Sequence, residues 1–176
     1  MPRRNRYRRP VILRGTSAKV TSPKIIKIGH VSSQTGALAP FAEADPFILD
    51  QIRTVLAKGI TNGGVSYEVQ IISKDSQSNT NRATQVAADL ILKEKVDLLV
   101  ASSRRETTNP VADQAEGNKV PCITDMTPWQ PYFFGRHGTP DEAFTWTYHA
   151  QFFPGVLLSF FDRRPSASRI AAGLII

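Results

Sequence analysis

Hydroxyl side chains follow the apolar stretches of this sequence. Ser33 comes shortly after the apolar residues 25–31, and Ser103 comes shortly after residues 98–101. Hydroxyl groups both donate and accept hydrogen bonds, so a set of them at strand ends suits the polar head of a small solute. No nucleophile, base and orienting group can be identified as a set, and no Gly-x-Ser-x-Gly turn is present. The pattern therefore predicts binding of a small polar molecule, with no catalytic residues.

The start of a helix is predicted beside one of these hydroxyl groups. Thr108 or Asn109 can cap a helix over residues 109–117, with Pro110 near the first helical position, where its missing N–H costs nothing. Free backbone N–H groups and the helix dipole attract anions at such a position. In an open α/β sheet, ligands also bind at this end of the strands. We therefore expect the solute to carry a carboxylate or another polar head.

Strands and helices are predicted to alternate along the chain. The first helix has Asp45 as its expected N-cap, and an earlier start near Phe41, with a kink at Pro46, remains open. Alternation with short connections predicts an α/β fold with a parallel sheet, right-handed crossovers and helices on both faces. The expected strands are 25–31, 67–73, 97–101 and 120–124. The expected apolar face of the first helix consists of Ile48, Ile52, Val55 and Leu56. That of the second helix consists of Ala83, Val86, Ala87, Leu90 and Ile91.

The positive charge of the chain is concentrated at its beginning. Residues 1–24 hold eight of the 22 Lys and Arg residues and no acidic residue, so residues 25–176 carry 14 basic and 15 acidic groups. We expect 1–24 to be a disordered basic leader. A nucleic-acid contact through this leader is an alternative, because phosphate contacts need only clustered cations. No specific nucleic-acid partner is expected.

This sequence lacks the patterns that mark several other classes of protein. The leader offers only the apolar residues Val11–Leu13, too few for a secretory signal peptide, and no run is long enough for a membrane span. No Gly-x-Gly-x-x-Gly or Walker loop is present, so no nucleotide cofactor is expected. Cys122 is the only cysteine and is expected in the core. His30, His137 and His149 stand alone, without metal-ligand spacing, so no metal is expected.

Four stretches of the chain resemble a known family. Residues 27–36, 74–83, 100–113 and 121–135 are similar to the N-terminal lobe of type I periplasmic solute-binding proteins. Within that group, the resemblance is to the branched-chain amino acid and amide-binding class, which serves ABC importers. It implies a Rossmann-like lobe, a small-molecule solute such as a branched-chain amino acid or short amide, an ABC permease as partner, and a periplasmic location.

The resemblance also implies which residues contact the ligand. Two loops carry over by position, one over 103–108 and one over 124–129, and the turn after the first strand lines the same rim. The expected ligand-binding residues are Ser33, Gln34, Thr35, Ser103, Thr107, Thr108, Thr127 and Trp129.

The chain departs from the family at both ends. Residues 25–150 are expected to be the N-terminal ligand-binding lobe, and residues 151–176 an incomplete crossover with a divergent tail. A full member has a second lobe that closes over the ligand, so we expect a truncated relative with half of the cleft. Arg104 and Arg105 lie beside the ligand loop, where they either pair with a carboxylate or face solvent.

Two further functions remain open at this point. A ligand-sensing receptor or regulator uses the same lobes, and a fused signalling or DNA-binding segment would favour it over an importer. A flavodoxin-like or Rossmann-like enzyme shares the architecture, because one scaffold hosts many functions. The enzyme would need a phosphate loop or a catalytic triad, which the sequence does not show.

Overall fold

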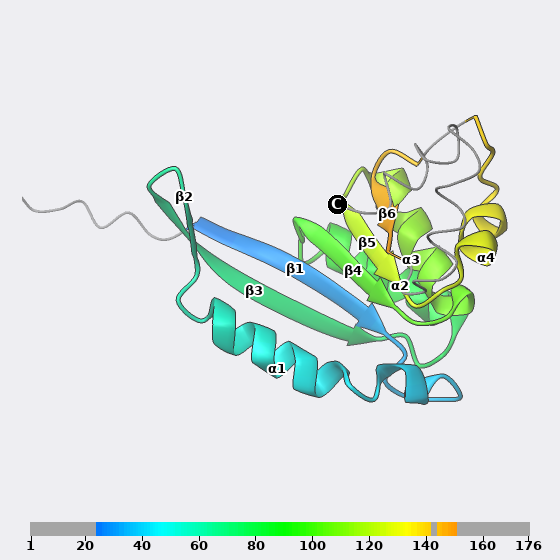
Figure 1. The fold of residues 1–176 in the computed structure, drawn as a ribbon, viewed down its shortest axis with the longest axis horizontal. Coiled ribbons are helices and arrows are strands. Elements are labelled where there is room, and N and C mark those ends of the chain that lie inside the picture. The colour runs from blue at the N-terminus through cyan, green and yellow to red at the C-terminus, as the bar shows by residue number, and fades with distance from the viewer. Residues whose placement is uncertain (1–23, 142–143, 151–176) are drawn as a thin grey trace, which may run out of the picture.

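A single sheet of six strands organises the protein (Figure 1). The computed structural model describes residues 24–141 and 144–150; the predictions for the basic leader before Lys24 and for the tail 151–176 lie outside these residues. The strands lie in the order β2-β3-β1-β4-β5-β6. Their bounds are β1 (Lys24–Ser32), β2 (Ile60–Asn62), β3 (Val65–Asp75), β4 (Leu98–Ser102), β5 (Cys122–Asp125) and β6 (Thr147–His149).

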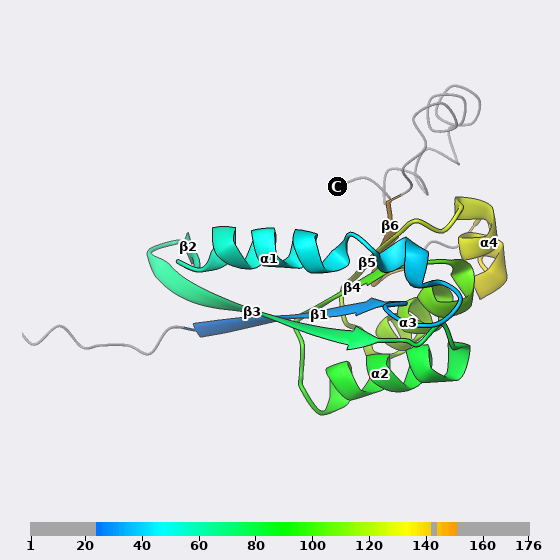
Figure 2. The ribbon, with the colours of Figure 1, turned by 90° about the horizontal axis from the view of Figure 1, so that it is seen from below.

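Helices cover the two faces of the sheet unequally. They are α1 (Asp45–Leu56), α2 (Thr80–Leu92), α3 (Arg105–Asn118) and the short α4 (Trp129–Phe133), with 3₁₀ turns η1 (Ala39–Ala42) and η2 (Phe134–Arg136). Figure 2 shows α1 on one face and α2 and α3 on the other. This division follows from right-handed crossovers, because the chain steps from β1 to β3 in one direction and from β3 through β4 to β5 in the opposite direction.

The predicted parallel sheet is confirmed, with one antiparallel strand added at its edge. β1 pairs in parallel with β3 and β4, and β5 pairs in parallel with β4 and β6. β2 pairs antiparallel with β3 through the turn Gly63–Gly64, where both residues have positive φ angles of 56° and 77°. Two glycines suit a tight hairpin turn of this kind. β2 was not predicted, because a strand of three residues gives too short a pattern to identify from the sequence.

The hydrophobic core lies between the sheet and the helices α2 and α3. All five apolar residues predicted for the buried side of α2 are buried, and the Asn79 side chain caps the helix by accepting a hydrogen bond from the Arg82 N–H at 2.9 Å. Gly29 in β1 permits the close packing: a Cβ at that position would lie 2.7 Å from Leu99 Cδ2.

The predicted start of α3 was wrong by four residues. The helix begins at Arg105 rather than at residue 109, and Pro110 lies inside it. A proline inside a helix leaves the carbonyl four residues earlier without its N–H donor. Here that carbonyl belongs to Glu106, and the Thr80 hydroxyl donates to it at 2.9 Å. The helix also ends one residue beyond Gly117, with Lys119 in the left-handed conformation at φ 59°.

The packing of α1 differs from the prediction. Asp45 is the first helical residue and not the N-cap, which is Ala44, although Pro46 lies in the first turn as expected. No residue of α1 is buried, and the predicted apolar face is exposed at Ile48, Ile52 and Val55. One face of a parallel sheet is therefore only partly covered within the described residues.

The central packing of α2 gives a direct test of the fold. We expect Leu90→Ala to lower the free energy of unfolding by about 2–5 kcal/mol, because Leu90 is fully buried and its truncation leaves a cavity. Urea unfolding followed by circular dichroism measures the change. Leu92→Ala is the matched control, since Leu92 ends the same helix and is 63% exposed. Equal effects of the two substitutions would contradict the packing described here.

Candidate functional site

Four buried hydroxyl groups meet at the carboxyl ends of β1, β3 and β4. Ser33 Oγ lies 2.9 Å from Ser76 Oγ, 2.9 Å from Ser103 Oγ and 3.2 Å from Thr107 Oγ1. Each of the four side chains is at most 2% exposed. Parallel strands end at one edge of a sheet, so their following residues converge there. The structure thus brings together Ser33, Ser103 and Thr107, which the sequence placed in one site.

The loop after β5 joins this network through Thr127. The Thr127 hydroxyl donates to the Ser103 carbonyl at 2.9 Å and is fully buried. His149 of β6 holds the same loop, because its Nε2 lies 2.6 Å from the Thr127 carbonyl, which can only accept. Nε2 therefore carries the proton, and Nδ1 accepts from the Thr124 hydroxyl at 2.8 Å. Burial lowers the pKa of His149 to about 4, so the ring is neutral at pH 7.

The turn after β1 is held by a carboxylate that the sequence analysis did not single out. Asp75 Oδ1 accepts from the backbone N–H groups of Gln34, Thr35 and Gln77, and Oδ2 accepts from the Thr35 hydroxyl at 2.6 Å. Burial raises the pKa of Asp75, but these hydrogen bonds outweigh it, so the pKa lies below its usual value. Gln34 and Thr35 are exposed in this turn. Asp75 is the last residue of β3, and the available signal was a carboxylate at the end of a strand within the stretch 74–83.

The remaining two predicted residues lie apart from the hydroxyl network. Thr108 is buried in α3, and its hydroxyl has no hydrogen-bond partner within the described structure. Trp129 begins α4 and is half-buried, with its ring 5.9 Å from that of Phe134.

A pocket of about 470 Å³ is lined by sequence neighbours of the network residues, whereas the network residues themselves do not line it. Thr107 follows Glu106 of the pocket wall along the chain, and Thr127 lies between the wall residues Met126 and Pro128. The pocket is formed by η1, the start of α3, the loop after β5 and α4. Its lining is Phe41, Arg104, Arg105, Glu106, Met126, Pro128 and Pro131. The predicted loops 103–108 and 124–129 supply five of these residues, whereas Phe41 and Pro131 were not predicted.

The pocket has a charged wall and an apolar wall. Glu106 accepts from Arg105 Nε at 3.2 Å, and its other oxygen lies 3.9 Å from Arg104 Nε. The Arg104 guanidinium also lies over the Phe41 ring, 5.6 Å from the ring centre. The two arginines and one glutamate leave a net positive charge at the mouth of the pocket. The two arginines therefore partly pair with a carboxylate and partly face solvent, so both readings of the sequence apply.

A buried polar cluster on the α1 face of the sheet was missed by the sequence analysis. His30 Nδ1 lies 3.0 Å from Ser73 Oγ, and its Nε2 lies 3.7 Å from Asp45 Oδ2 of α1. Burial lowers the pKa of His30 and raises that of the nearby Asp125. In residues 24–141 and 144–150, no three His, Cys, Asp or Glu side chains could hold a metal ion.

Cys122 lies in the core, as the sequence predicted. Its side chain is fully buried, and burial raises the pKa of the thiol to about 12. The group is therefore protonated and unreactive at neutral pH.

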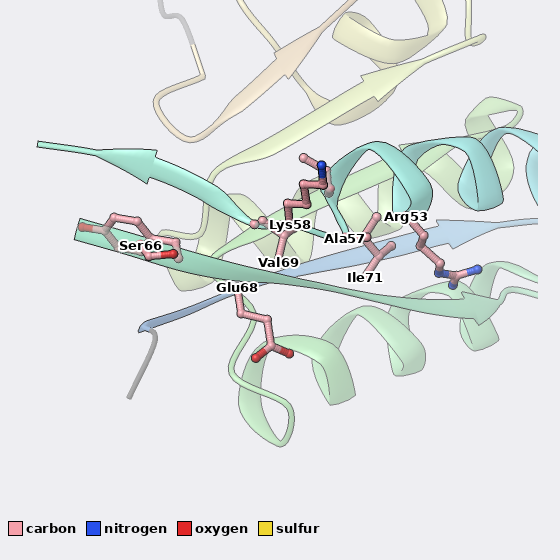
Figure 3. A pocket seen from close by; sticks show the side chains of 10 residues that line it. Arg53, Ala57, Lys58, Ser66, Glu68, Val69 and Ile71 are labelled. Atoms are coloured by element: carbon pink, nitrogen blue, oxygen red, sulfur yellow. The ribbon is translucent and has the colours of Figure 1, made fainter. Parts of the chain in front are cut away.

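A second cavity lies at the opposite end of the strands. It has a volume of about 410 Å³ and opens between the end of α1 and the first half of β3 (Figure 3). Its residue Tyr67 pairs with Lys24 at the start of β1, far along the strand from Ser33. Figure 3 shows Glu68 on the side of β3 opposite to Lys58. None of the predicted ligand-binding residues lines either cavity, but the predicted loops 103–108 and 124–129 supply five of the residues that line the first pocket, so we place the candidate site there.

Comparison with known proteins identifies the family. Residues 25–158 match the family model described as periplasmic binding protein, so the chain belongs to this family. A search of curated proteins gave no match. No helix in the part of the chain that the structure describes has the length and hydropathy of a membrane-spanning segment.

Solved structures of type I solute-binding proteins from ABC transporters share the fold. LivJ from Streptococcus pneumoniae, a branched-chain amino acid transporter substrate-binding protein in complex with isoleucine, has 20% identity and a TM-score of 0.57 over 86% of this chain and 47% of that chain. LivK from Thermotoga maritima, a leucine-binding protein, has 23% identity and a TM-score of 0.54, and the match covers 71% of this chain and 32% of LivK. A solute-binding protein from Rhodopseudomonas palustris in complex with 3,4-dihydroxybenzoic acid has 16% identity and a TM-score of 0.57 over 72% and 32%. The chain therefore spans less than half the length of these proteins.

The hydroxyl network is expected to stabilise the fold. Ser33→Ala removes the only side-chain partner that Ser76 Oγ and Ser103 Oγ have within the described residues and should lower the free energy of unfolding by about 1–3 kcal/mol. Urea unfolding measures this loss, with Ser66→Ala as the control, because Ser66 is an exposed serine of β3. A loss no larger than that of the control would show that the network contributes nothing to stability.

His149 should make stability depend on pH. Because the pKa falls from 6.5 to about 4 on folding, the unfolded chain binds this proton more tightly. The contribution of neutral His149 to the free energy of unfolding is fully present above about pH 6.5. It is lost as the pH falls toward 4, and the loss is about 3 kcal/mol at most. His149→Gln, which keeps a donor for the Thr127 carbonyl, should flatten this part of the curve. Unfolding in urea at pH 7, 5.5 and 4.5 compares the slopes, and parallel curves would argue against the assignment.

Proposed function

We propose that this chain is the N-terminal ligand-binding part of a solute-binding protein for an ABC importer. The pocket at the carboxyl ends of β4 and β5 carries the proposal, because open α/β sheets bind ligands at this edge. Membership of the periplasmic binding protein family supports the role. A periplasmic location and an ABC permease as partner follow from the same proposal.

The proposed ligand is a small solute with a polar head and an apolar body. The arginines and the start of α3 are placed to hold the head, and Phe41, Met126 and the two prolines to contact the body. Branched-chain amino acids and short amides are the classes expected from the sequence. A second lobe would cover the outward side of the ligand, and this chain alone should bind weakly because it buries only one side.

The proposed role includes no catalysis. Ser33 hydrogen-bonds to Ser103 and to Thr107, and Thr127 donates to a main-chain carbonyl, so none of these four hydroxyls is paired with a base that would activate it. Burial also lowers the pKa of His149, which is bonded on both ring nitrogens. These groups are suited to fixing the pocket wall rather than to transferring protons.

Weak binding to the pocket can be measured with the whole chain. We expect saturation-transfer NMR to detect members of a panel of branched-chain amino acids, short amides and small carboxylic acids. Phe41→Ala should raise the Kd of the detected ligands about three- to tenfold, because an apolar wall of the pocket is lost. Phe47→Ala is the control, since Phe47 is exposed on α1 and does not line the pocket.

The outcome separates the importer role from other functions of the fold. If saturation-transfer NMR detects binding of no ligand in the panel, the proposed function is wrong. Binding that responds equally to both phenylalanine substitutions would place the ligand elsewhere on the molecule.

A further inference from the structure

We propose that Asn62 is a site of spontaneous deamidation, in which the backbone nitrogen of Gly63 attacks the Asn62 side chain and water completes the conversion to aspartate or isoaspartate. The inference does not depend on the proposed function. It rests on the Asn-Gly dipeptide at the turn between β2 and β3 and on the freedom of both residues at that turn.

The reaction needs only the chain and water. The Gly63 nitrogen forms a bond to Cγ of Asn62, the bond from Cγ to Nδ2 breaks, and the proton lost by Gly63 leaves with the side-chain nitrogen as ammonia. The product is a five-membered succinimide ring. Water then adds to one of the two ring carbonyl carbons and breaks the bond from that carbon to the Gly63 nitrogen, which regains a proton. Opening at Cγ gives aspartate, opening at the main-chain carbon gives isoaspartate, and nothing is oxidised or reduced.

The turn leaves both reacting groups accessible. Asn62 is exposed, and its side chain has no hydrogen-bond partner among the described residues. A Cβ placed on Gly63 or Gly64 would meet no atom within 4 Å, so nothing packs against the turn. Glycine also has no side chain to hinder the approach of its own nitrogen, and its backbone rotates freely.

The position of the turn in the sheet also favours ring closure. Asn62 is the last residue of β2, which has three residues and lies at the edge of the sheet. Figure 1 shows this turn at the end of the long strands β1 and β3, away from β4 and β5. Ring closure requires the backbone of Asn62 to rotate out of its extended conformation. A short edge strand opens with a small free energy, so this rotation is accessible to the folded chain.

The two asparagines at the start of α2 are held in a different way. Arg82 follows Asn81, and its backbone N–H donates to Asn79 Oδ1 at 2.9 Å. The same hydrogen bond fixes the side chain of Asn79 and occupies the nitrogen that would attack Asn81. Both residues therefore resist the reaction as long as the helix is capped.

The two asparagines of α3 are also protected. Pro110 follows Asn109 and has no N–H proton to lose. Lys119 follows Asn118, and its backbone N–H donates to the Glu116 carbonyl at 3.3 Å. The Asn118 side chain donates to a carbonyl one turn earlier, at 2.8 Å. Within the described residues, Asn62 is thus the asparagine that combines an exposed side chain with a following glycine.

The two products should affect the hairpin differently. Aspartate keeps the main chain unchanged and adds one negative charge at the turn. Isoaspartate places an extra carbon in the main chain, so residue 62 can no longer pair with Val65 in the present register. The pairs Thr61↔Ser66 and Ile60↔Tyr67 are then the only ones left to hold β2.

Mass spectrometry of the full chain tests the inference. The chain is incubated at pH 8 and 37 °C, either in buffer, where circular dichroism confirms that it stays folded, or in 6 M guanidinium chloride. Samples are digested with trypsin at intervals, and deamidation adds about 1 Da to a peptide. Residues 59–74 form one tryptic peptide, in which Asn62 is the only asparagine. The peptides 75–82 and 106–119 carry the other four asparagines of the described chain.

We expect peptide 59–74 of the folded chain to gain mass about tenfold faster than either comparison peptide, with isoaspartate among the products. Asn62→Gln should reduce this gain about tenfold, because a longer side chain closes a less favourable ring. Gly63→Asp should do the same, since it keeps a residue suited to this turn but places a side chain beside the attacking nitrogen. Asn118→Gln is the matched control and should leave the gain in peptide 59–74 unchanged.

Three results would overturn the inference. The first is a gain in peptide 59–74 that occurs in guanidinium chloride but is no faster than that of 106–119 in buffer, because the fold then protects the turn. The second is an equal gain in Gly63→Asp and in the unsubstituted chain, because the attack is then not made by the nitrogen of residue 63. The third is the absence of any gain at Asn62 in both solvents.

Discussion

One side-chain oxygen, Ser33 Oγ, holds together the ends of three strands. It has one proton to donate and two lone pairs to accept, and it has three hydroxyl partners, in Ser76, Ser103 and Thr107. A buried hydroxyl without a partner is unfavourable by an amount comparable to the net value of several hydrogen bonds. The loops after β1, β3 and β4 are therefore fixed relative to one another. The pocket wall begins immediately beyond these residues, so its shape depends on this closed set of bonds.

The fold could be predicted where the signal was local. The buried side of α2 was predicted residue by residue, because Leu90 and its neighbours repeat at helical spacing and Asn79 caps the helix. The start of α3 could not be predicted, because the group that makes Pro110 tolerable is the hydroxyl of Thr80, far away in the sequence. The cover of α1 was mispredicted for a related reason. An apolar stripe predicts that a surface can be buried, but not that the described residues supply the partner.

The candidate site was predictable in outline and not in its detail. Parallel strands end at one edge, so the meeting of Ser33, Ser103 and Thr107 followed from the topology. Their burial did not follow, because it depends on the Thr127 loop and on His149 from the last described strand. The network residues are buried and do not line the pocket, whereas the sequence-adjacent residues Glu106 and Met126 line it. Phe41 was missed because a single phenylalanine in a turn carries no periodic signal.

The uneven cover of the sheet has a consequence for how the protein opens. α2 packs into the core on one face, whereas α1 has no buried residue on the other. Segments with few buried apolar contacts open with small free energies, while core helices open only with the whole domain. The backbone amides of α1 will therefore exchange with solvent deuterium long before those of α2. The sheet with α2 and α3 forms the stable part of the fold, and α1 is held to it more weakly.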